Sequence, residues 1–122
     1  MRDLATAVLT PNEHECLCCY VVRMLNDFPC DGTHRHALRY RDLMAPRATA
    51  LLTRLERVGA CCCDCELFVN GYWLRSWVRQ YAELGDIEDD HGAAGYVNLP
   101  ACQGVRRGSV RPCSNWVCVS RW

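Results

Sequence analysis

The sequence predicts an α+β fold of three to four short helices and a small β element, clasped by a metal site. Two observations predict the fold. Several segments repeat apolar residues at three- and four-residue steps, as amphipathic helices do, and one segment alternates with period two, as strands do. A third observation, 11 cysteines among 122 residues, points to a metal site or a disulfide scaffold. A chain of this length builds one hydrophobic core, so we expect one compact unit.

The first helix is predicted to begin at Thr10. Residues 10–13 (Thr-Pro-Asn-Glu) match a capping box with proline at the first helical position. Pro29 prevents the helix from continuing. Three cysteines fall on this helix, Cys16, Cys18 and Cys19, and free cysteine usually packs as a small hydrophobic residue. The apolar positions form one stripe that we expect to face the core: Leu17, Tyr20, Val21, Met24, Leu25 and Phe28.

Two shorter helices are predicted next. The turn sequence at residues 30–33 (Cys-Asp-Gly-Thr) contains an aspartate and a threonine that can cap a following helix. That helix is indicated by the stripe Ala37, Tyr40, Leu43 and Met44, and Pro46 ends it. The third helix has the stripe Ala48, Leu51, Leu52, Leu55 and Val58, and Gly59 is its C-terminal stop.

Residues 61–70 alternate as a strand does, and the strand is predicted to end in a tight turn at Asn70-Gly71. A fourth helix is indicated by the stripe Trp73, Leu74, Trp77, Val78, Tyr81 and Leu84, closed by Gly85. We therefore place the domain at residues 10–85. Residues 86–122 follow as an acidic loop and a tail containing arginine, cysteine and tryptophan, whose order the sequence leaves open.

Two short pairs of potential ligands, Cys30 with His36 and Cys63 with Cys65, suit a metal ion. A tetrahedral zinc ion is bound by thiolate and imidazole donors of this kind. On a strand, Cys63 and Cys65 would point to the same side, as joint coordination requires. The sequence therefore predicts a zinc site of three cysteines and one histidine. The run of cysteines at 61–63 leaves the register of the second pair open.

The same segments resemble DUF2695, a bacterial family of unknown function. The resemblance rests on residues 30–36 (Cys-Asp-Gly-Thr-His-Arg-His), residues 63–67 (Cys-Asp-Cys-Glu-Leu) and Asn70, and it spans roughly residues 10 to 71. The family's first histidine falls on Gly32, and His34 stands where the family has an apolar residue. This favours His36 as the ligand and leaves His34 as an exposed helix residue or a substitute ligand. The resemblance supports a site and implies no reaction.

A closed structural zinc site is favoured over a hydrolytic one. A catalytic zinc keeps an open position and has a carboxylate nearby as general base. The candidates, Asp64 and Glu66, would face away from the cysteines on a strand, so we expect them to bind backbone N–H groups or Arg35. Redox catalysis finds little support, because the pair Cys16 and Cys19 would lie in the helix body rather than at the helix start.

A protein-interaction module is the favoured function, because Trp73, Trp77 and Tyr81 form a large aromatic stripe that could serve the core or an interface. The alternative is a nucleic-acid-binding adaptor, suggested by the arginine-rich tail and by three arginines of one predicted helix, Arg35, Arg39 and Arg41. The formal net charge of +0 predicts no steering toward nucleic acid, and the acidic remainder of the chain argues against binding to a duplex. A metal-dependent hydrolase is a further alternative.

The N-terminus is predicted to carry no secretory signal, and no apolar run is long enough to cross a membrane. We therefore expect a cytoplasmic protein without membrane contact. In that reducing compartment, clustered cysteines more often hold a metal than pair in disulfides.

Overall fold

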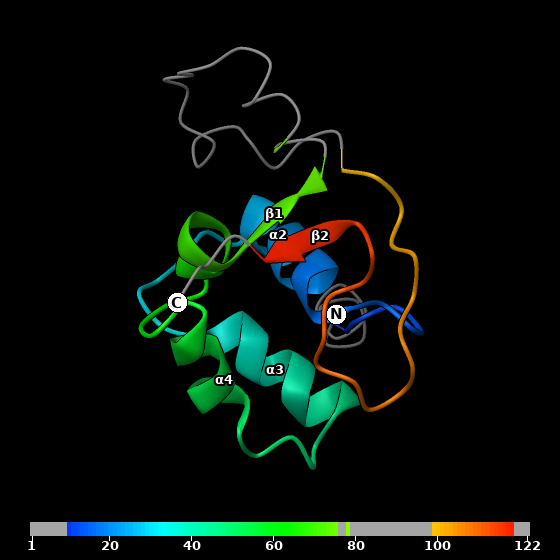
Figure 1. The fold of residues 1–122 in the computed structure, drawn as a ribbon. Coiled ribbons are helices and arrows are strands. Elements are labelled where there is room, and N and C mark those ends of the chain that lie inside the picture. Colours follow the sequence, from blue (N-terminus) through cyan, green and yellow to red (C-terminus); the bar gives the residue numbers. More distant parts are fainter. Residues whose placement is uncertain (1–9, 76–77, 79–98, 119–122) are drawn as a thin grey trace.

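A computed structural model describes residues 10–75, 78 and 99–118 of the chain. The helices among them are α2 (Leu17–Asp27), α3 (Arg35–Met44), α4 (Leu51–Arg57) and a short π-helix, η1 (Leu67–Gly71). Strands β1 (Tyr72–Leu74) and β2 (Trp116–Cys118) form a two-stranded antiparallel sheet. Figure 1 shows this sheet crossing in front of α2, with α3 and α4 below it. The predicted α+β fold class is confirmed.

Helix α2 is the central core helix. Its predicted stripe is confirmed, because Leu17, Tyr20, Val21, Met24 and Leu25 are all buried. The predicted start at Thr10 is wrong, since Cys16 is the N-cap. The helix cannot begin earlier because His14 has a φ of 63°, which an α-helix cannot include. Helix α2 ends at Asp27, before Pro29, as the sequence predicts.

Helices α3 and α4 each bury one narrow face. Ala37 and Tyr40 of α3 are buried, and the Tyr40 hydroxyl donates a hydrogen bond to the Glu15 carbonyl oxygen at 2.7 Å, which ties α3 to the segment before α2. In α4, Leu51 and Leu55 are buried. Both predicted stripes were too wide, because Leu43 of α3 and Leu52 of α4 are exposed.

The strand predicted at residues 61–70 is wrong. Residues 64 and 65 form a turn, and η1 follows at once. The apparent alternation fails in burial, because the neighbours Leu67 and Phe68 are both buried while Val69 is 60% exposed. Asn70 lies within η1 rather than in a tight turn, and its side-chain amide donates to the Gly59 carbonyl oxygen at 2.9 Å.

The fourth predicted helix is also wrong at its beginning, because Trp73 and Leu74 lie in β1. Arg75 and Val78 are helical, and the rest of this predicted helix, with Trp77 and Tyr81, lies outside the described residues. Among the described residues, no helix has both the length and the hydrophobicity that a membrane span requires.

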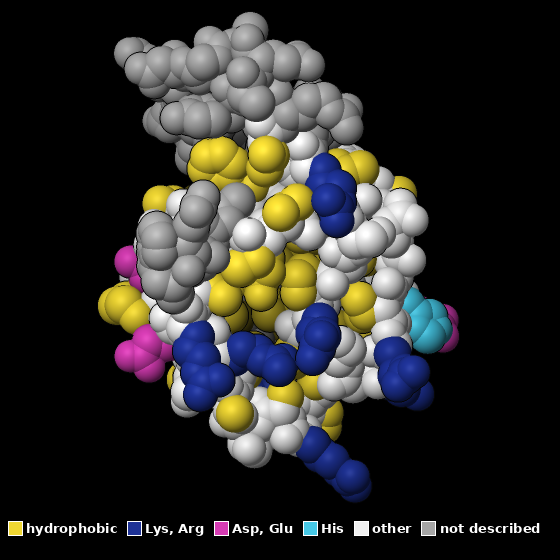
Figure 2. All heavy atoms as spheres, in the orientation of Figure 1, with side chains coloured by type: hydrophobic (Ala, Val, Ile, Leu, Met, Phe, Trp, Pro, Cys, Tyr) yellow, Lys and Arg dark blue, Asp and Glu magenta, His cyan; other side chains and the backbone are white. Residues whose placement is uncertain are grey.

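The segment at residues 99–118 adds side chains to the core. Val110, Cys113 and Trp116 are buried in the same cluster as α2. The Trp116 ring lies 5.2 Å from the ring of Phe68, measured between centroids. Figure 2 shows hydrophobic side chains in a hollow at the centre of one face, with arginine side chains gathered below them.

Candidate metal centre

Three cysteines from two distant segments meet beside the start of α3. The sulfurs of Cys30, Cys63 and Cys65 all lie within 4.8 Å of one another, and the Cys63 and Cys65 sulfurs are 3.4 Å apart. All three residues are half-buried. Ligand sulfurs around a tetrahedral zinc ion are about 3.8 Å apart, as a zinc–sulfur distance of about 2.3 Å requires. The spacing therefore suits one shared metal ion.

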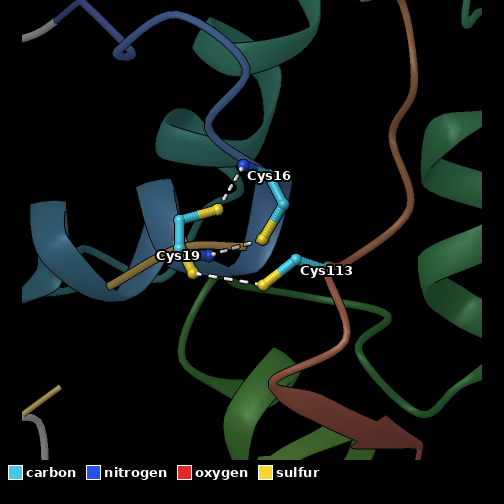
Figure 3. Close-up of side chains that lie close together, drawn as sticks. Cys16, Cys19 and Cys113 are labelled. Carbon is cyan, nitrogen blue, oxygen red and sulfur yellow. Dashed lines mark hydrogen bonds between the residues drawn. The ribbon is translucent and has the colours of Figure 1, made fainter. Parts of the chain in front are cut away.

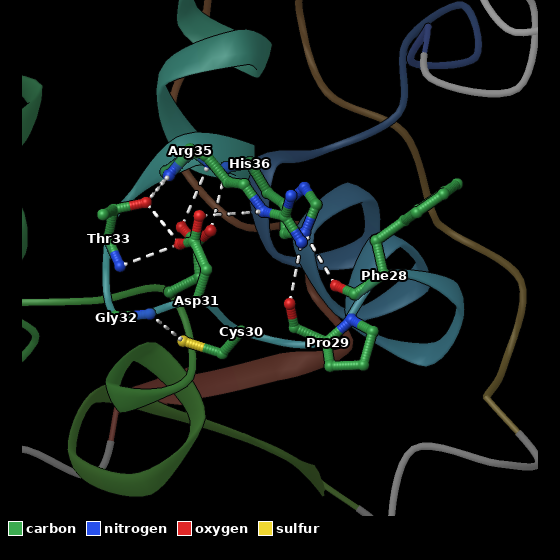
Figure 4. Close-up of polar contacts among 10 residues, drawn as sticks. Phe28, Pro29, Cys30, Asp31, Gly32, Thr33, Arg35 and His36 are labelled. Atoms are coloured by element: carbon green, nitrogen blue, oxygen red, sulfur yellow. Dashed lines mark hydrogen bonds and ion pairs between the residues drawn. The ribbon is translucent and has the colours of Figure 1, made fainter.

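The first of these sulfurs is held by a tight loop. Gly32, with a φ of 87° that favours glycine, donates its backbone N–H to the Cys30 sulfur at 3.4 Å. The Asp31 carboxylate accepts a hydrogen bond from the Thr33 backbone N–H at 3.1 Å and another from the Thr33 hydroxyl. Figure 4 shows this loop folded back on itself, with the Cys30 sulfur beside the Gly32 backbone.

Asp64 brings the second segment to the first. Its carboxylate accepts hydrogen bonds from the backbone N–H groups of His36 at 2.8 Å and Ala37 at 3.2 Å, and its own N–H donates to the Thr33 carbonyl oxygen at 3.0 Å. These are the donors that an N-cap side chain normally satisfies, and the carboxylate also interacts favourably with the helix dipole. Asp64 thus caps α3 from outside that helix, and its neighbours Cys63 and Cys65 are placed beside Cys30.

The Asp64 side chain is only 1% exposed. Burial raises the pKa of its carboxyl group, while the hydrogen bonds from α3 act in the opposite direction by stabilising the carboxylate. The expectation that Asp64 and Glu66 bind backbone N–H groups is confirmed, because Glu66 accepts a hydrogen bond from the Cys62 N–H at 2.9 Å.

The run of cysteines at 61–63 divides between two environments. Cys61 and Cys62 are joined by a disulfide bond on the exposed side of the loop, beside Glu66. Cys63 instead groups with Cys30 and Cys65. The register that the sequence left open is therefore the one in which Cys63 joins the sulfur group.

The two histidines of the motif point to backbone carbonyls. The Nε2 atom of His36 lies 3.0 Å from the Phe28 carbonyl oxygen, and Nε2 of His34 lies 2.9 Å from the Ala60 carbonyl oxygen. Figure 4 shows the His36 ring beside the Phe28 backbone. His36 is not part of the three-sulfur group, so its role as a ligand stays a prediction. His34 is buried as the N-cap of α3, which corrects the expectation of an exposed helix residue.

The pKa values of Cys30 and Cys65 are shifted in opposite directions. Burial acts to raise the pKa of Cys30, but hydrogen bonds from the Gly32 and Cys65 backbone groups outweigh it and lower that pKa. Burial and the neighbouring sulfurs of Cys63 and Cys30 raise the pKa of Cys65 to about 12. Three thiolates this close repel one another, and a bound cation would remove that repulsion.

A second sulfur group was missed in the sequence analysis. Cys16, Cys19, Cys102 and Cys113 also have their sulfurs within 4.8 Å of one another. The available signal was the Cys-x-x-Cys spacing of Cys16 and Cys19, which was assigned to a helix body because the helix start was placed too early. The positions of Cys102 and Cys113 in the sequence match no spacing that is typical of metal ligands.

The fold and the sulfur groups define a small, cysteine-rich α+β protein with candidate metal sites. Residues 17–70 match the family model described as "Protein of unknown function (DUF2695)". The resemblance drawn from the motifs is thereby confirmed for this segment, which contains all three cysteines of the candidate centre. Nothing among the curated proteins or the solved structures matches the chain.

Proposed function

We propose that this chain is a zinc-binding module in which a structural metal ion is held by Cys30, Cys63 and Cys65, with His36 as the fourth ligand. The observation that supports it is the convergence of three sulfurs, from a loop and a turn far apart in the sequence, on one point. Thiolates favour zinc over hard cations such as magnesium or calcium. A metal at this point would hold the turn at residues 63–65 against the start of α3.

The chemistry of His36 supports its assignment as the fourth ligand. A carbonyl oxygen only accepts hydrogen bonds, so the Nε2 atom that faces Phe28 must carry the proton. In the neutral ring this leaves Nδ1 with a free lone pair. Metal-binding histidines commonly donate their other ring N–H to a backbone carbonyl in this way. His34 makes the same kind of hydrogen bond, from its ring to the Ala60 carbonyl oxygen. The His34→Ala variant is therefore the matched control for His36→Ala.

A structural role is supported by the two carboxylates next to the sulfurs. A hydrolytic zinc site needs a carboxylate that can reach a metal-bound water. The Asp64 carboxylate is engaged by two N–H groups of α3, and that of Glu66 by the N–H of Cys62. Both carboxylates therefore accept backbone hydrogen bonds, which supports a structural site rather than a hydrolytic one.

For the cellular role, we propose that the module binds a partner protein. Of the aromatic stripe suggested by the sequence, Trp73 is half-buried on β1, and Trp77 and Tyr81 lie outside the described residues. Exposed Leu43, Leu52 and Val69 add apolar surface on the helical side. Aromatic and aliphatic side chains of this kind anchor protein interfaces.

Elemental mass spectrometry of protein purified without added metal tests the proposed site. The Cys63→Ser variant is expected to carry about one zinc ion per chain less than the unmodified protein. The Cys118→Ser variant is the matched control, because Cys118 is exposed on β2 and belongs to neither sulfur group, and it should keep its zinc. His36→Ala should lose zinc where His34→Ala retains it. Equal zinc in Cys63→Ser and Cys118→Ser would refute the site.

A further inference from the structure

We propose that Cys16, Cys19, Cys102 and Cys113 form a second zinc site, which fastens residues 99–118 to α2. The four sulfurs lie within 4.8 Å of one another. Those of Cys19 and Cys113 are 3.8 Å apart (Figure 3), which equals the spacing of about 3.8 Å expected around tetrahedral zinc. Four thiolates complete the coordination of a structural zinc ion without water.

The backbone around these sulfurs is arranged as it is around metal-bound thiolates. Cys16 is the N-cap of α2, and its sulfur accepts the backbone N–H of Cys19 at 3.3 Å. The Cys16 N–H in turn donates to the Cys102 sulfur at 3.3 Å, and the Trp116 indole N–H donates to the Cys19 sulfur at 3.3 Å. Such N–H donors stabilise the negative charge that several thiolates share around a metal.

The loop that carries Cys102 repeats the geometry of the loop that carries Cys30. In each, a glycine two residues after the cysteine has a positive φ, 89° for Gly104 and 87° for Gly32. Each glycine donates its backbone N–H to the cysteine sulfur, at 3.3 Å for Gly104 and 3.4 Å for Gly32. The chain thus presents a sulfur in the same local manner at both groups.

Burial favours a closed site over a reactive one. Cys16 and Cys113 are buried, and Cys19 and Cys102 are half-buried. A disulfide between Cys19 and Cys113 would require the sulfurs to approach from 3.8 Å to about 2.05 Å and would leave the other two unused. A zinc ion uses all four sulfurs at their present spacing. Three of the four cysteines, Cys16, Cys102 and Cys113, lie outside the segment that matches the family.

The consequence is a link between the C-terminal segment and the core. Cys113 lies three residues before Trp116, which begins β2 and packs on Phe68. A metal bound here would hold β2 against β1 and close the core over α2. The site is independent of the proposed centre at Cys30, because the two groups share no ligand.

Zinc content of the full chain separates the two sites. The unmodified protein is expected to carry about two zinc ions, and the Cys113→Ser and Cys102→Ser variants about one each, while Cys118→Ser keeps both. A single zinc ion that is insensitive to both Cys113→Ser and Cys102→Ser overturns this inference and leaves the proposed function standing. A single zinc ion that is lost with Cys113→Ser and kept with Cys63→Ser supports this inference and refutes the proposed function.

A measurement on the unmodified chain avoids any variant that fails to fold. In the zinc-bound protein, alkylation of thiols followed by peptide mass spectrometry is expected to modify half-buried Cys102 no faster than buried Cys18, because a metal-bound thiolate is protected from the reagent. Cys18 is the matched comparison because it belongs to neither sulfur group, and exposed Cys118 shows that the reagent is active. Labelling of Cys102 at least ten-fold faster than that of Cys18 in the zinc-bound protein overturns the inference.

Discussion

Removal of the metal from the centre at Cys30, Cys63 and Cys65 is expected to unfold most of the chain. Binding of zinc at structural sites contributes about 10–16 kcal/mol in zinc-finger peptides. Domains of this size are stable by about 5–15 kcal/mol. The proposed ion would join the loop before α3 to the turn before η1, so its loss would release the contact between these segments.

Circular dichroism measures this effect. Treatment with a zinc chelator should remove most of the helical signal at 25 °C, and added zinc should restore it. The Cys113→Ser variant isolates the centre, because the second sulfur group is then incomplete. A chelated Cys113→Ser protein whose thermal midpoint stays within a few degrees of its zinc-bound form would contradict the expected dependence on metal.

Asp64→Ala is expected to lower the free energy of unfolding by about 3 kcal/mol, because it removes two charge-assisted hydrogen bonds and leaves two buried N–H groups unpaired. For a chain of this length the thermal midpoint should fall by about 10 °C. Zinc affinity should fall as well, because Cys63 and Cys65 flank Asp64 and lose their attachment to α3. Chemical denaturation and zinc titration measure the two effects.

The control for Asp64→Ala is Asp42→Ala. Asp42 is exposed near the other end of α3 and pairs with Arg41 at 3.2 Å. Exposed ion pairs contribute little, so the control should change stability by less than about 1 kcal/mol. If Asp64→Ala costs no more than Asp42→Ala, Asp64 does not cap α3 in the way that its contacts indicate.

The helices were predictable because their positions depend on sequence features that lie within a few residues of one another. The apolar stripe of α2 indicated which face of this helix is buried, and the prolines after α2 and α3 indicated where these helices end. The start of α2 was missed because the capping pattern at Thr10 is local, whereas the left-handed His14 depends on contacts such as that of its Nδ1 atom with the Val105 carbonyl oxygen at 3.1 Å. Contacts at this distance along the chain leave no periodic signal.

The candidate centre was predictable in part for the same reason. Two short pairs typical of zinc ligands were recognised, Cys30 with His36 and Cys63 with Cys65. The structure groups the three cysteine sulfurs, and His36 is not part of that group. The strand expected at residues 61–70 is absent because Asp64, which lies between Cys63 and Cys65 in the sequence, is hydrogen-bonded to the start of α3. The pairing of β1 with β2 and the approach of Cys102 and Cys113 to α2 are long-range contacts that the composition of the tail does not reveal.

X-ray absorption at the zinc edge of the Cys113→Ser variant tests the central claim most directly, because it counts the atoms bound to the metal when only the centre at Cys30 is complete. The expected spectrum has three sulfur ligands at about 2.3 Å and one nitrogen ligand at about 2.0 Å. A shell of oxygen and nitrogen atoms without sulfur, or protein with no zinc to measure, would contradict the assignment of Cys30, Cys63 and Cys65 as the metal centre.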